Sequence, residues 1–416
     1  SMSDVQEQFK DKILKLLAKY FPTADRKTMD MLINYILQQN IGLGNIDILL
    51  KDINLEEIVV NNAKEPAWVY HRKYGWLKTN VIIPNESRIR HYSTIIGRDV
   101  GKEITLLNPL MDAHLKTGDR VNATLSPISS KGNTLTIRKF GVRPWTITDL
   151  LRDKTISYEG AALLWIAVQN ELSVIVSGGT ASGKTSMLNS IANYFPPNQR
   201  IISIEDTREL MLPKMLHWVP METRLANPEG KGGIEMLDLI VNSLRMRPDR
   251  ILVGEIRRKK EAEVLFEAMH TGHSVYGTLH ANNARETINR LTSPPIDLPK
   301  QILSGLSLIA VQNLNRRTGR RRTLQIAEIL PNGDPRILMQ LNPIRDKLEF
   351  LNEPLAMLET LSLYTGMSKS NIYSDLKSKI KILKWMASRN VININKIGLI
   401  MSRYYQDRPI IESKGV

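Results

Sequence analysis

The amino-acid sequence predicts an α/β protein whose central part is a helix-covered sheet built around a phosphate-binding loop. Three observations lead to this fold class. Helical stretches alternate with short apolar runs between about residues 146 and 330, which is typical of a sheet covered by helices. The pattern G-x-x-x-x-G-K-T occupies residues 178–185, between a strand-like run at 174–176 and a helix-like run at 186–192. Helical periodicity then returns from about residue 345.

Length and composition bound the kind of protein. A chain of 416 residues is too long for one ordinary core, so two or three domains are expected. Hydrophobic residues make up 42% and charged residues 24%, which is typical of a soluble globular protein. No apolar run approaches the ~20 residues of a membrane-spanning helix. The polar N-terminus has no apolar segment like that of a secretory signal.

Charge and cysteine content narrow the possibilities further. The chain has no cysteine, which excludes disulfides and cysteine-ligated zinc and fits a cytoplasmic protein. Its net charge of +15 could attract nucleic acid, an anionic membrane surface or an acidic protein. Charge alone does not choose among these partners.

The N-terminal third is predicted to be a mixture of helices and strands. Apolar residues at helical spacing predict two amphipathic helices within residues 4–40. Strand-like runs follow at 57–60 and 67–70, then a helix from 87 to about 100 and a strand at 134–138. Glycine and proline at 141–145 predict a linker.

The central region is predicted to hold four buried strands, at residues 174–176, 201–204, 251–253 and 275–279. A run of eight apolar residues at 161–168 reads as a buried helix. The predicted organisation is a helical segment, an α+β domain, a linker, a domain built on the helix-covered sheet and a helical C-terminal region, at residues 1–40, 41–140, 141–148, 149–340 and 341–416.

The loop at 178–185 predicts nucleoside triphosphate binding. Its glycines allow the backbone to wrap closely around a phosphate and direct amide groups at it. The helix that follows adds partial positive charge at its N-terminus. Lys184 can reach the β- and γ-phosphates, and the Thr185 hydroxyl can bind Mg²⁺.

Acidic residues follow two of the predicted strands. Glu205 and Asp206 end the run at 201–204, and Glu255 follows the run at 251–253. Ligands of such sheets bind where parallel strands end. Glu255 is therefore the candidate base that orients the attacking water, and Glu205 and Asp206 are candidates for organising the metal. The structural alternative is that these acids only solvate strand ends.

Three of the seven histidines lie between residues 270 and 280. His280 follows the predicted strand at 275–279 and could contact a phosphate or a magnesium-bound water. His270 and His273 fit a junction between a helix and a turn. A metal pair at spacing i, i+3 is the less favoured alternative, because no cysteine or carboxylate set accompanies it.

A cluster of five arginines at residues 316–322 surrounds a Thr-Gly pair. Such a cluster could contact a nucleic-acid backbone. Because Thr-Gly is typical of turns, a solvated hairpin turn between Ile309 and Leu324 is the favoured interpretation.

Four motifs in a fixed order carry a family resemblance. Residues 178–185, 204–210, 244–257 and 271–281 resemble the Walker A, Asp box, Walker B and His box of the type II/type IV secretion and type IV pilus ATPases. The segments 108–113, 118–122 and 135–140 are similar to the family's N-terminal domain. Residues 217–220, 223–224, 229–232 and 404–407 resemble its archaeal branch. One departure is Arg-Arg-Lys-Lys-Glu at 257–261, where the family commonly has Arg-Gly-x-Glu.

The resemblance implies an ATPase that uses ATP and Mg²⁺ and works as a hexameric ring, each subunit having an N-terminal domain and a RecA-like motor domain. It implies catalytic roles for Glu255, Glu205, His280 and Arg257, and metal binding by Thr185, Glu205 and Asp206. The implied nucleotide-binding residues are Gly178, Gly179, Thr180, Ala181, Ser182, Gly183, Lys184, Thr185 and Ser186, with Arg120 and Arg138 from the N-terminal domain.

The implied partners are other copies of the chain, a polytopic membrane platform protein and, indirectly, a pilin-like or secreted protein. The implied location is the cytoplasm, at the inner face of the membrane. Nucleic acid is not an expected partner. The rival hypotheses are a DNA-translocating ring, suggested by the basic charge, and a nucleotide-sensing adaptor, which the presence of Glu255 disfavours.

Overall fold

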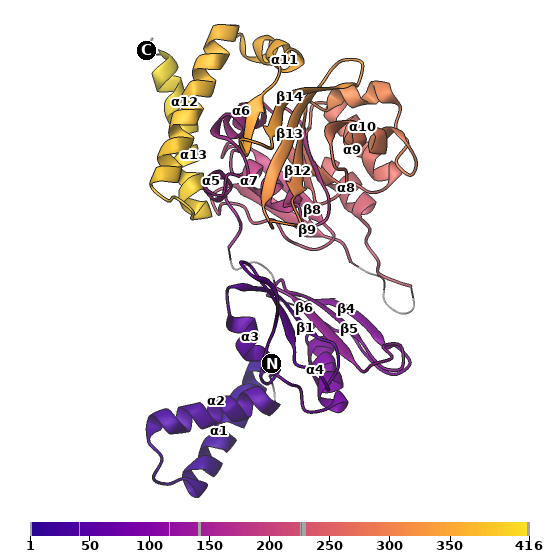
Figure 1. Cartoon of the computed structure of the whole chain (residues 1–416), viewed down its shortest axis with the longest axis vertical. Coiled ribbons are helices and arrows are strands. Elements are labelled where there is room, and N and C mark those ends of the chain that lie inside the picture. Colours follow the sequence, from indigo (N-terminus) through magenta and orange to yellow (C-terminus); the bar gives the residue numbers. More distant parts are fainter. Residues whose placement is uncertain are drawn as a thin grey trace. The chain divides into compact units, whose positions relative to one another are not determined.

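The computed structural model describes residues 2–40, 42–115, 117–139, 143–224, 226 and 230–413, with side chains described between residues 9 and 406 of these ranges. The chain divides into two compact units, Ser1–Val142 and Arg143–Val416, each described by itself. Figure 1 shows the elements of both. The predicted linker residues Gly141 and Val142 lie outside the described residues, as do Phe140 and Glu229 of the family-like segments.

The first unit contains four helices and six strands among its described residues. They are α1 (Met2–Tyr20), α2 (Arg26–Asn40), α3 (Ile46–Lys51), β1 (Leu55–Val60), β2 (Trp68–His71), β3 (Gly75–Lys78), α4 (Glu86–Asp99), β4 (Leu110–His114), β5 (Arg120–Thr124) and β6 (Thr134–Arg138). The two predicted N-terminal helices are confirmed, and they pack on a small apolar core of Ile13, Leu17 and Ile33. The predicted helix from residue 87 is confirmed as α4, which begins after the Asn85 side chain caps the Arg88 amide.

The strands of the first unit form one antiparallel sheet in the order β3-β2-β1-β6-β5-β4. Alternate residues of β5 and β6 are buried, which is the pattern of a sheet with one covered face. The covered face packs with α4 around an apolar core that includes Ile58, Ile89, Ile96, Val121 and Ile137. The strands β4 and β5 carry no long apolar run, and the sequence pattern did not predict them.

The second unit holds the remaining elements. They are α5 (Ile147–Arg152), α6 (Tyr158–Gln169), β7 (Val174–Gly178), α7 (Lys184–Ala192), β8 (Arg200–Glu205), β9 (His217–Glu222), α8 (Met236–Leu244), β10 (Arg250–Val253), α9 (Lys259–His270), β11 (Ser274–Leu279), α10 (Ala284–Thr292), η1 (Lys300–Gly305), β12 (Leu308–Leu314), β13 (Arg321–Ile329), β14 (Pro335–Asn342), β15 (Lys347–Phe350), α11 (Ala356–Thr365), α12 (Lys369–Ser388) and α13 (Ile394–Ser413).

These strands form a nine-stranded sheet in the order β15-β14-β13-β12-β7-β11-β10-β8-β9. The six strands from β12 to β9 are parallel, and β13, β14 and β15 extend the sheet as antiparallel neighbours. The four predicted strands are confirmed as β7, β8, β10 and β11. Apolar clusters cover both faces, which is why these strands are apolar along their whole length. Helices α5, α6 and α7 lie on one side and α8, α9 and α10 on the other (Figure 1).

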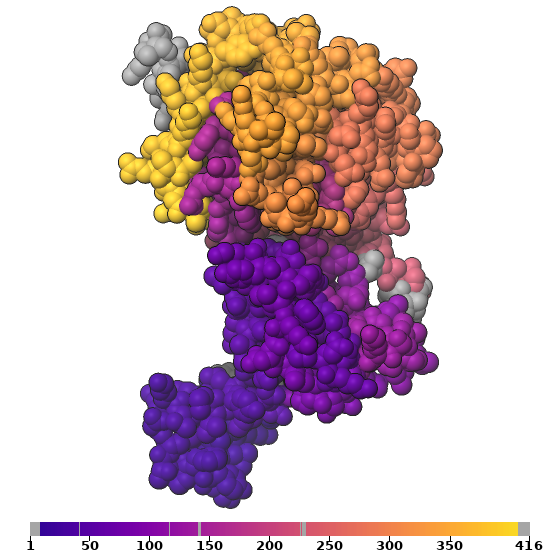
Figure 2. Space-filling model, viewed as in Figure 1, coloured from indigo at the N-terminus to yellow at the C-terminus, as the bar shows by residue number. Residues whose placement is uncertain are grey.

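The C-terminal helices pack against α6, and the predicted buried helix at 161–168 is confirmed as part of it. Lys379 of α12 is fully buried, pairs with Asp375 at 2.7 Å and receives support from the Tyr404 hydroxyl at 2.8 Å. Its ammonium also lies 5.3 Å from the ring of Trp165. A buried charge needs such partners, so this cluster fixes α12 and α13 on the second unit. Figure 2 shows the C-terminal helices (yellow) on the surface of this unit beside the segment from β12 to α11 (orange).

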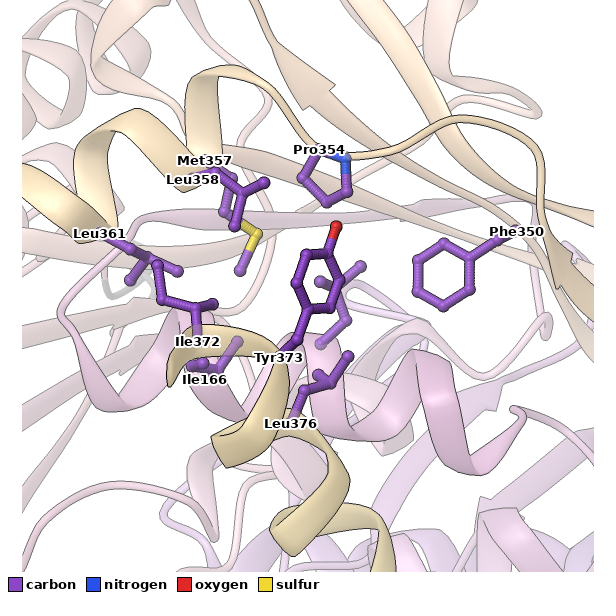
Figure 3. A pocket seen from close by; sticks show the side chains of 10 residues that line it. Ile166, Phe350, Pro354, Met357, Leu358, Leu361, Ile372, Tyr373 and Leu376 are labelled. Carbon is purple, nitrogen blue, oxygen red and sulfur yellow. The ribbon is translucent and has the colours of Figure 1, made fainter. Parts of the chain in front are cut away.

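A small apolar cavity lies between α6, β15, α11 and α12 (Figure 3). Its volume is about 20 Å³, and Tyr373, Phe350 and Leu376 are among the residues that line it. A space of this size holds about one water molecule. The cavity is therefore a packing gap and not a nucleotide pocket.

The C-terminal region differs from its prediction at its start. Helical periodicity was expected from about residue 345, but β15 occupies Lys347–Phe350 and the first helix begins at Ala356. The four residues of β15 pair with β14, where Leu348 is buried and Lys347 is exposed. An alternation of buried and exposed residues over only four positions is too short to be distinguished from the long helical pattern that follows it.

Candidate functional site

The candidate site forms where neighbouring parallel strands end. The strands β12, β7, β11, β10 and β8 lie side by side and run in the same direction. The segments that follow them therefore emerge at one edge of the sheet, where ligands of such sheets bind. This edge gathers the phosphate loop after β7, Asp206 after β8, Glu255 after β10 and His280 after β11.

The phosphate loop connects β7 to α7, as its sequence predicts. A Cβ atom on Gly178 would lie 2.3 Å from Ser182 Oγ and 2.6 Å from the Gln312 carbonyl oxygen, so only glycine fits there. Gly183 precedes α7 with a φ of +93°, a left-handed conformation that side chains rarely adopt. The Ser182 hydroxyl donates to the Gly179 carbonyl at 2.8 Å, which closes the loop on itself.

Lys184 is the first residue of α7, and its ammonium lies over the loop. It donates to the carbonyl oxygens of Gly178 at 3.0 Å and Gly179 at 3.1 Å. Burial lowers the pKa of Lys184, while the negative charges of Glu255 and Glu209 oppose that shift. The ammonium is thus inside the ring of the loop and near two carboxylates. Thr185 and Ser186, the other predicted contacts on α7, are half-buried beside it.

Glu205, the last residue of β8, is 2% exposed. Its Oε1 accepts from the backbone amides of Glu209 at 2.8 Å and Leu210 at 3.0 Å, so it fixes the segment after the strand. Its Oε2 is buried with no hydrogen-bond partner among the described residues. Burial raises the pKa of Glu205 to about 7, against the lowering effect of the two amides.

Glu255 and Asp206 are joined by one arginine. Arg257 donates to Glu255 Oε2 from Nε at 2.9 Å and from a terminal nitrogen at 2.6 Å. Its other terminal nitrogen lies 2.6 Å from Asp206 Oδ2. The side chains of Asp206 and Arg257 are 44% and 59% exposed, so this pairing is open to water and to an incoming phosphate. The structure therefore brings three predicted site residues into contact.

The unusual segment 257–261 leads into α9, which begins at Lys259. The carboxylate of Glu261 accepts from the backbone amides of Arg257 at 3.2 Å and Arg258 at 3.0 Å, and Arg258 is the residue that caps the helix. An acid in this position satisfies amides that the helix leaves free. The four basic residues thus leave the helix start intact, although a glycine is missing.

The histidines separate into two groups. His280 follows β11 at the candidate edge and is half-buried. His270 Nε2 lies 2.9 Å from the carbonyl of Ile302, and His273 Nδ1 lies 3.4 Å from the Thr271 hydroxyl. These two sit at the end of α9, as the structural interpretation expected. The described residues contain no group of three or more acids and histidines placed to hold a metal.

Arg120 and Arg138 belong to the first unit and face each other across β5 and β6. Arg120 pairs with Asp112 of β4 at 2.8 Å. Like charges at paired strand positions repel, and Asp112 balances one of these two. Their role at a nucleotide stays a prediction.

Three residues of the edge were missed by the sequence interpretation. Gln312 of β12 packs under Gly178, and Asn282 Oδ1 lies 3.4 Å from the position of a Cβ on Gly179. Arg321, within the basic cluster, donates from Nε to the Ala181 carbonyl at 2.9 Å.

The turn predicted for that cluster is confirmed between β12 and β13, but Arg322 is only 9% exposed and pairs with Asp346 at 2.8 Å. Arg316, Arg317 and Arg320 are exposed, as a solvated turn requires, so Arg322 is the residue of the cluster that departs from this interpretation. No local sequence signal marked the contacts of Arg321 and Arg322.

The residues present fit a magnesium nucleotide. The glycines leave room that side chains would fill, and Lys184 places a cation inside the loop. The unpartnered Glu205 Oε2, the Asp206 carboxylate and the Thr185 hydroxyl are oxygen donors of the kind that Mg²⁺ prefers. Magnesium usually binds to one or two carboxylates together with substrate phosphates, so a complete protein cage is not needed.

Glu205 should make the stability of the nucleotide-free protein depend on pH. Its folded-state pKa of about 7 exceeds its ordinary value of 4.5, so the folded protein holds an extra proton between these values. Stability should therefore fall as the pH rises through this window. Glu205→Gln cannot ionise and should not lose stability in this way. Its free energy of unfolding should therefore rise relative to that of wild type by up to about 3 kcal/mol as the pH increases from about 4.5 to 7. Urea unfolding of wild type and Glu205→Gln at about pH 4.5 and about pH 7 measures this change. A stability difference between the two proteins that stays the same at both pH values would contradict the expectation.

Comparison with known proteins identifies relatives along most of the chain. Residues 108–336 match the family model described as type II/IV secretion system protein. An uncharacterized protein of Methanocaldococcus jannaschii is 34% identical over 385 residues, covering 89% of this chain and 69% of that protein. A second uncharacterized protein of that organism is 43% identical over 237 residues, but the match covers 56% of this chain and only 32% of the relative.

Solved structures share the fold. The X-ray structure of the ATPase DotB of Yersinia pseudotuberculosis has a TM-score of 0.51 at 18% identity, covering 86% of this chain and 92% of that one. The predicted fold class, a RecA-like α/β domain after an α+β domain and before a helical C-terminal region, is confirmed. No helix within the described ranges is both long and apolar enough to cross a membrane.

Proposed function

The chain belongs to the type II/IV secretion system protein family and is an ATPase, and we propose that it is the motor of a secretion or pilus-assembly machine. The observation that carries the proposal is the gathering of a phosphate loop, Lys184, Glu255 and Asp206 at one edge of a parallel sheet. These are the groups that phosphoryl transfer to water requires.

Each residue has a defined task in the proposed reaction. The amides of the loop and Lys184 hold the β- and γ-phosphates, and Thr185, Asp206 and Glu205 Oε2 would hold Mg²⁺. Bound Mg²⁺ neutralises charge on the phosphates. Glu255 orients a water and accepts its proton as the water oxygen bonds to the γ-phosphorus. The bond to the ADP oxygen breaks, and ADP and phosphate remain.

Arg257 would change partners during this cycle. In the structure it pairs with both Glu255 and Asp206 and balances the charge of these carboxylates. A γ-phosphate offers the guanidinium an alternative bidentate partner. We propose that Arg257 then turns towards the phosphate and releases Glu255 for the water. His280 would face the γ-phosphate from the end of β11.

The motor action would follow from loss of the γ-phosphate. Cations drawn to it, including Arg120 and Arg138 of the N-terminal unit, would be released after hydrolysis, so the two units would close and open with each turnover. We propose a homo-hexamer that passes this motion to a polytopic membrane protein at the cytoplasmic face of the membrane. The cargo would be a pilin-like or secreted protein, and nucleic acid would take no part.

The mass of the full-length protein tests the ring. Native mass spectrometry or sedimentation with and without Mg²⁺ and a non-hydrolysable ATP analogue should give a mass of six chains with nucleotide. An ATP-hydrolysing monomer that never assembles under these conditions would contradict the ring. ATPase activity that rises with added DNA and falls steeply with salt would instead favour the DNA-translocating alternative.

A further inference from the structure

The arginine-rich hairpin lies next to the phosphate loop because of sheet pairing. Its first strand, β12, runs parallel to β7, and Gln312 pairs with Gly178 at the start of the loop. The turn after β12 is closed by the Asn315 amide, which donates to the Arg320 carbonyl at 2.9 Å. The chain then returns along β13, so Arg321 stands at the same edge as the loop.

Arg321 contacts the outermost part of the loop. Its Nε donates to the Ala181 carbonyl at 2.9 Å, and its Cδ lies 3.5 Å from where a Cβ on Gly183 would be. Ala181 has a φ of +60°, which is unfavourable for a residue with a side chain. The hydrogen bond from the charged Arg321 side chain therefore holds the loop at the residue whose backbone conformation is unfavourable.

The neighbouring residue, Arg322, fixes the start of β13, which carries Arg321. Arg322 binds both carboxylate oxygens of Asp346, at 2.8 and 2.9 Å, and donates to the Asp153 carbonyl at 3.0 Å. Such bidentate pairs have a strict geometry. The backbone at Arg321 is thus held in two ways, by the side-chain bonds of Arg322 and by the pairing of β13 with β12.

Peptide geometry links this contact to phosphate binding. In a trans peptide the carbonyl of Ala181 and the amide of Ser182 point in opposite directions. With the carbonyl directed at Arg321, the Ser182 amide turns into the loop, where it donates a long hydrogen bond to the Gly179 carbonyl at 3.4 Å that a phosphate oxygen would replace. An amide directed into the loop is one that can bind a phosphate.

We propose that Arg321 is a positioning residue that holds the phosphate loop ready for the β-phosphate of a nucleotide. The inference rests on the proposed nucleotide site and adds to it a residue from outside the four family motifs. Without this contact, nucleotide binding must also order the loop, which weakens affinity. Because the loop surrounds the β-phosphate, ADP and ATP should be affected alike.

The test compares Arg321→Ala with Arg317→Ala in the full-length protein. Arg317 lies in the same hairpin turn and is exposed, so its loss removes the same charge without touching the loop. Titration with fluorescent ADP and with a non-hydrolysable ATP analogue, both with Mg²⁺, should show about tenfold weaker binding of both by Arg321→Ala. Arg317→Ala should bind like wild type. Arg321→Lys, which keeps a charged donor, should recover part of the affinity.

A second readout does not depend on nucleotide. Amide hydrogen exchange of residues 178–185 in the nucleotide-free protein should be faster in Arg321→Ala than in Arg317→Ala, with unchanged exchange in β10 and β11. Equal binding and equal exchange by the two variants would overturn the inference. So would weaker binding of the ATP analogue alone, which indicates a direct γ-phosphate contact. A wild-type protein that binds neither nucleotide would instead overturn the proposed function.

Discussion

Replacing Glu255 with glutamine should slow ATP hydrolysis by about 10²–10⁴-fold while nucleotide binding persists. Glutamine cannot accept the proton of the attacking water, so the loss should fall on the chemical step. Steady-state phosphate release gives the rate, and titration with a fluorescent nucleotide gives the affinity.

The structure indicates that this variant will fold. Glu255 follows β10, whose four residues are all buried and paired on both sides, and its side chain is 25% exposed. Glutamine retains an oxygen that can accept from Arg257 Nε, which lies 2.9 Å from the present carboxylate. The expected loss of stability is therefore small, since a partly exposed ion pair contributes about 1 kcal/mol or less.

Glu263→Gln is the matched control. Glu263 is exposed on α9, so the substitution removes one carboxylate charge without reaching the sheet edge. Its hydrolysis rate should equal that of wild type. If Glu255→Gln turned over ATP as fast as the control, another group would have to be the base.

The Lys184→Ala substitution should weaken nucleotide binding and reduce hydrolysis by about 10²–10³-fold, because a half-buried cation at the proposed phosphate site is removed. The Lys184 ammonium is held inside the loop by the carbonyls of Gly178 and Gly179. Both the affinity for the ATP analogue and the rate should fall, in contrast to Glu255→Gln, where only the rate falls.

Lys260→Ala provides the comparison for this variant. Lys260 is exposed near the start of α9. Its replacement by alanine removes one positive charge, as Lys184→Ala does, but removes no contact with the phosphate loop. Thermal unfolding of both proteins shows whether they fold. A folded Lys184→Ala protein that binds and hydrolyses ATP like Lys260→Ala would rule out the loop at 178–185 as the phosphate site.

The central part of the fold was predictable because its signals are local. Four apolar runs became β7, β8, β10 and β11, and the phosphate-loop pattern lies between a strand and a helix as expected. In contrast, β9 and the antiparallel extension from β13 to β15 were not predicted, although each of these strands pairs with a strand that is near it in the sequence. Most positions of β9, β14 and β15 are at least partly exposed, and β13 begins with two arginines, so none of these strands carries a long apolar run that would mark it in the sequence.

The site was predictable in its residue types and less so in its contacts. The positions of Glu255 and Asp206 after neighbouring strands follow from the motif order, but their shared partner Arg257 is a tertiary contact. The sequence likewise gives no sign that Glu205 uses one oxygen to hold two backbone amides. Arg321 was hidden in a run of arginines whose individual surroundings only the sheet pairing decides.

The most direct test of the account is Mg²⁺-dependent phosphate release by the wild-type protein and Glu255→Gln, measured on material whose mass is determined in the same experiment. The account predicts release by a six-chain assembly that requires Mg²⁺ and nearly disappears in the variant. Equal release by both proteins, or wild-type protein that binds ATP and Mg²⁺ as an assembled ring without hydrolysing it, would contradict the central claim that this sheet edge is an ATP-hydrolysing site.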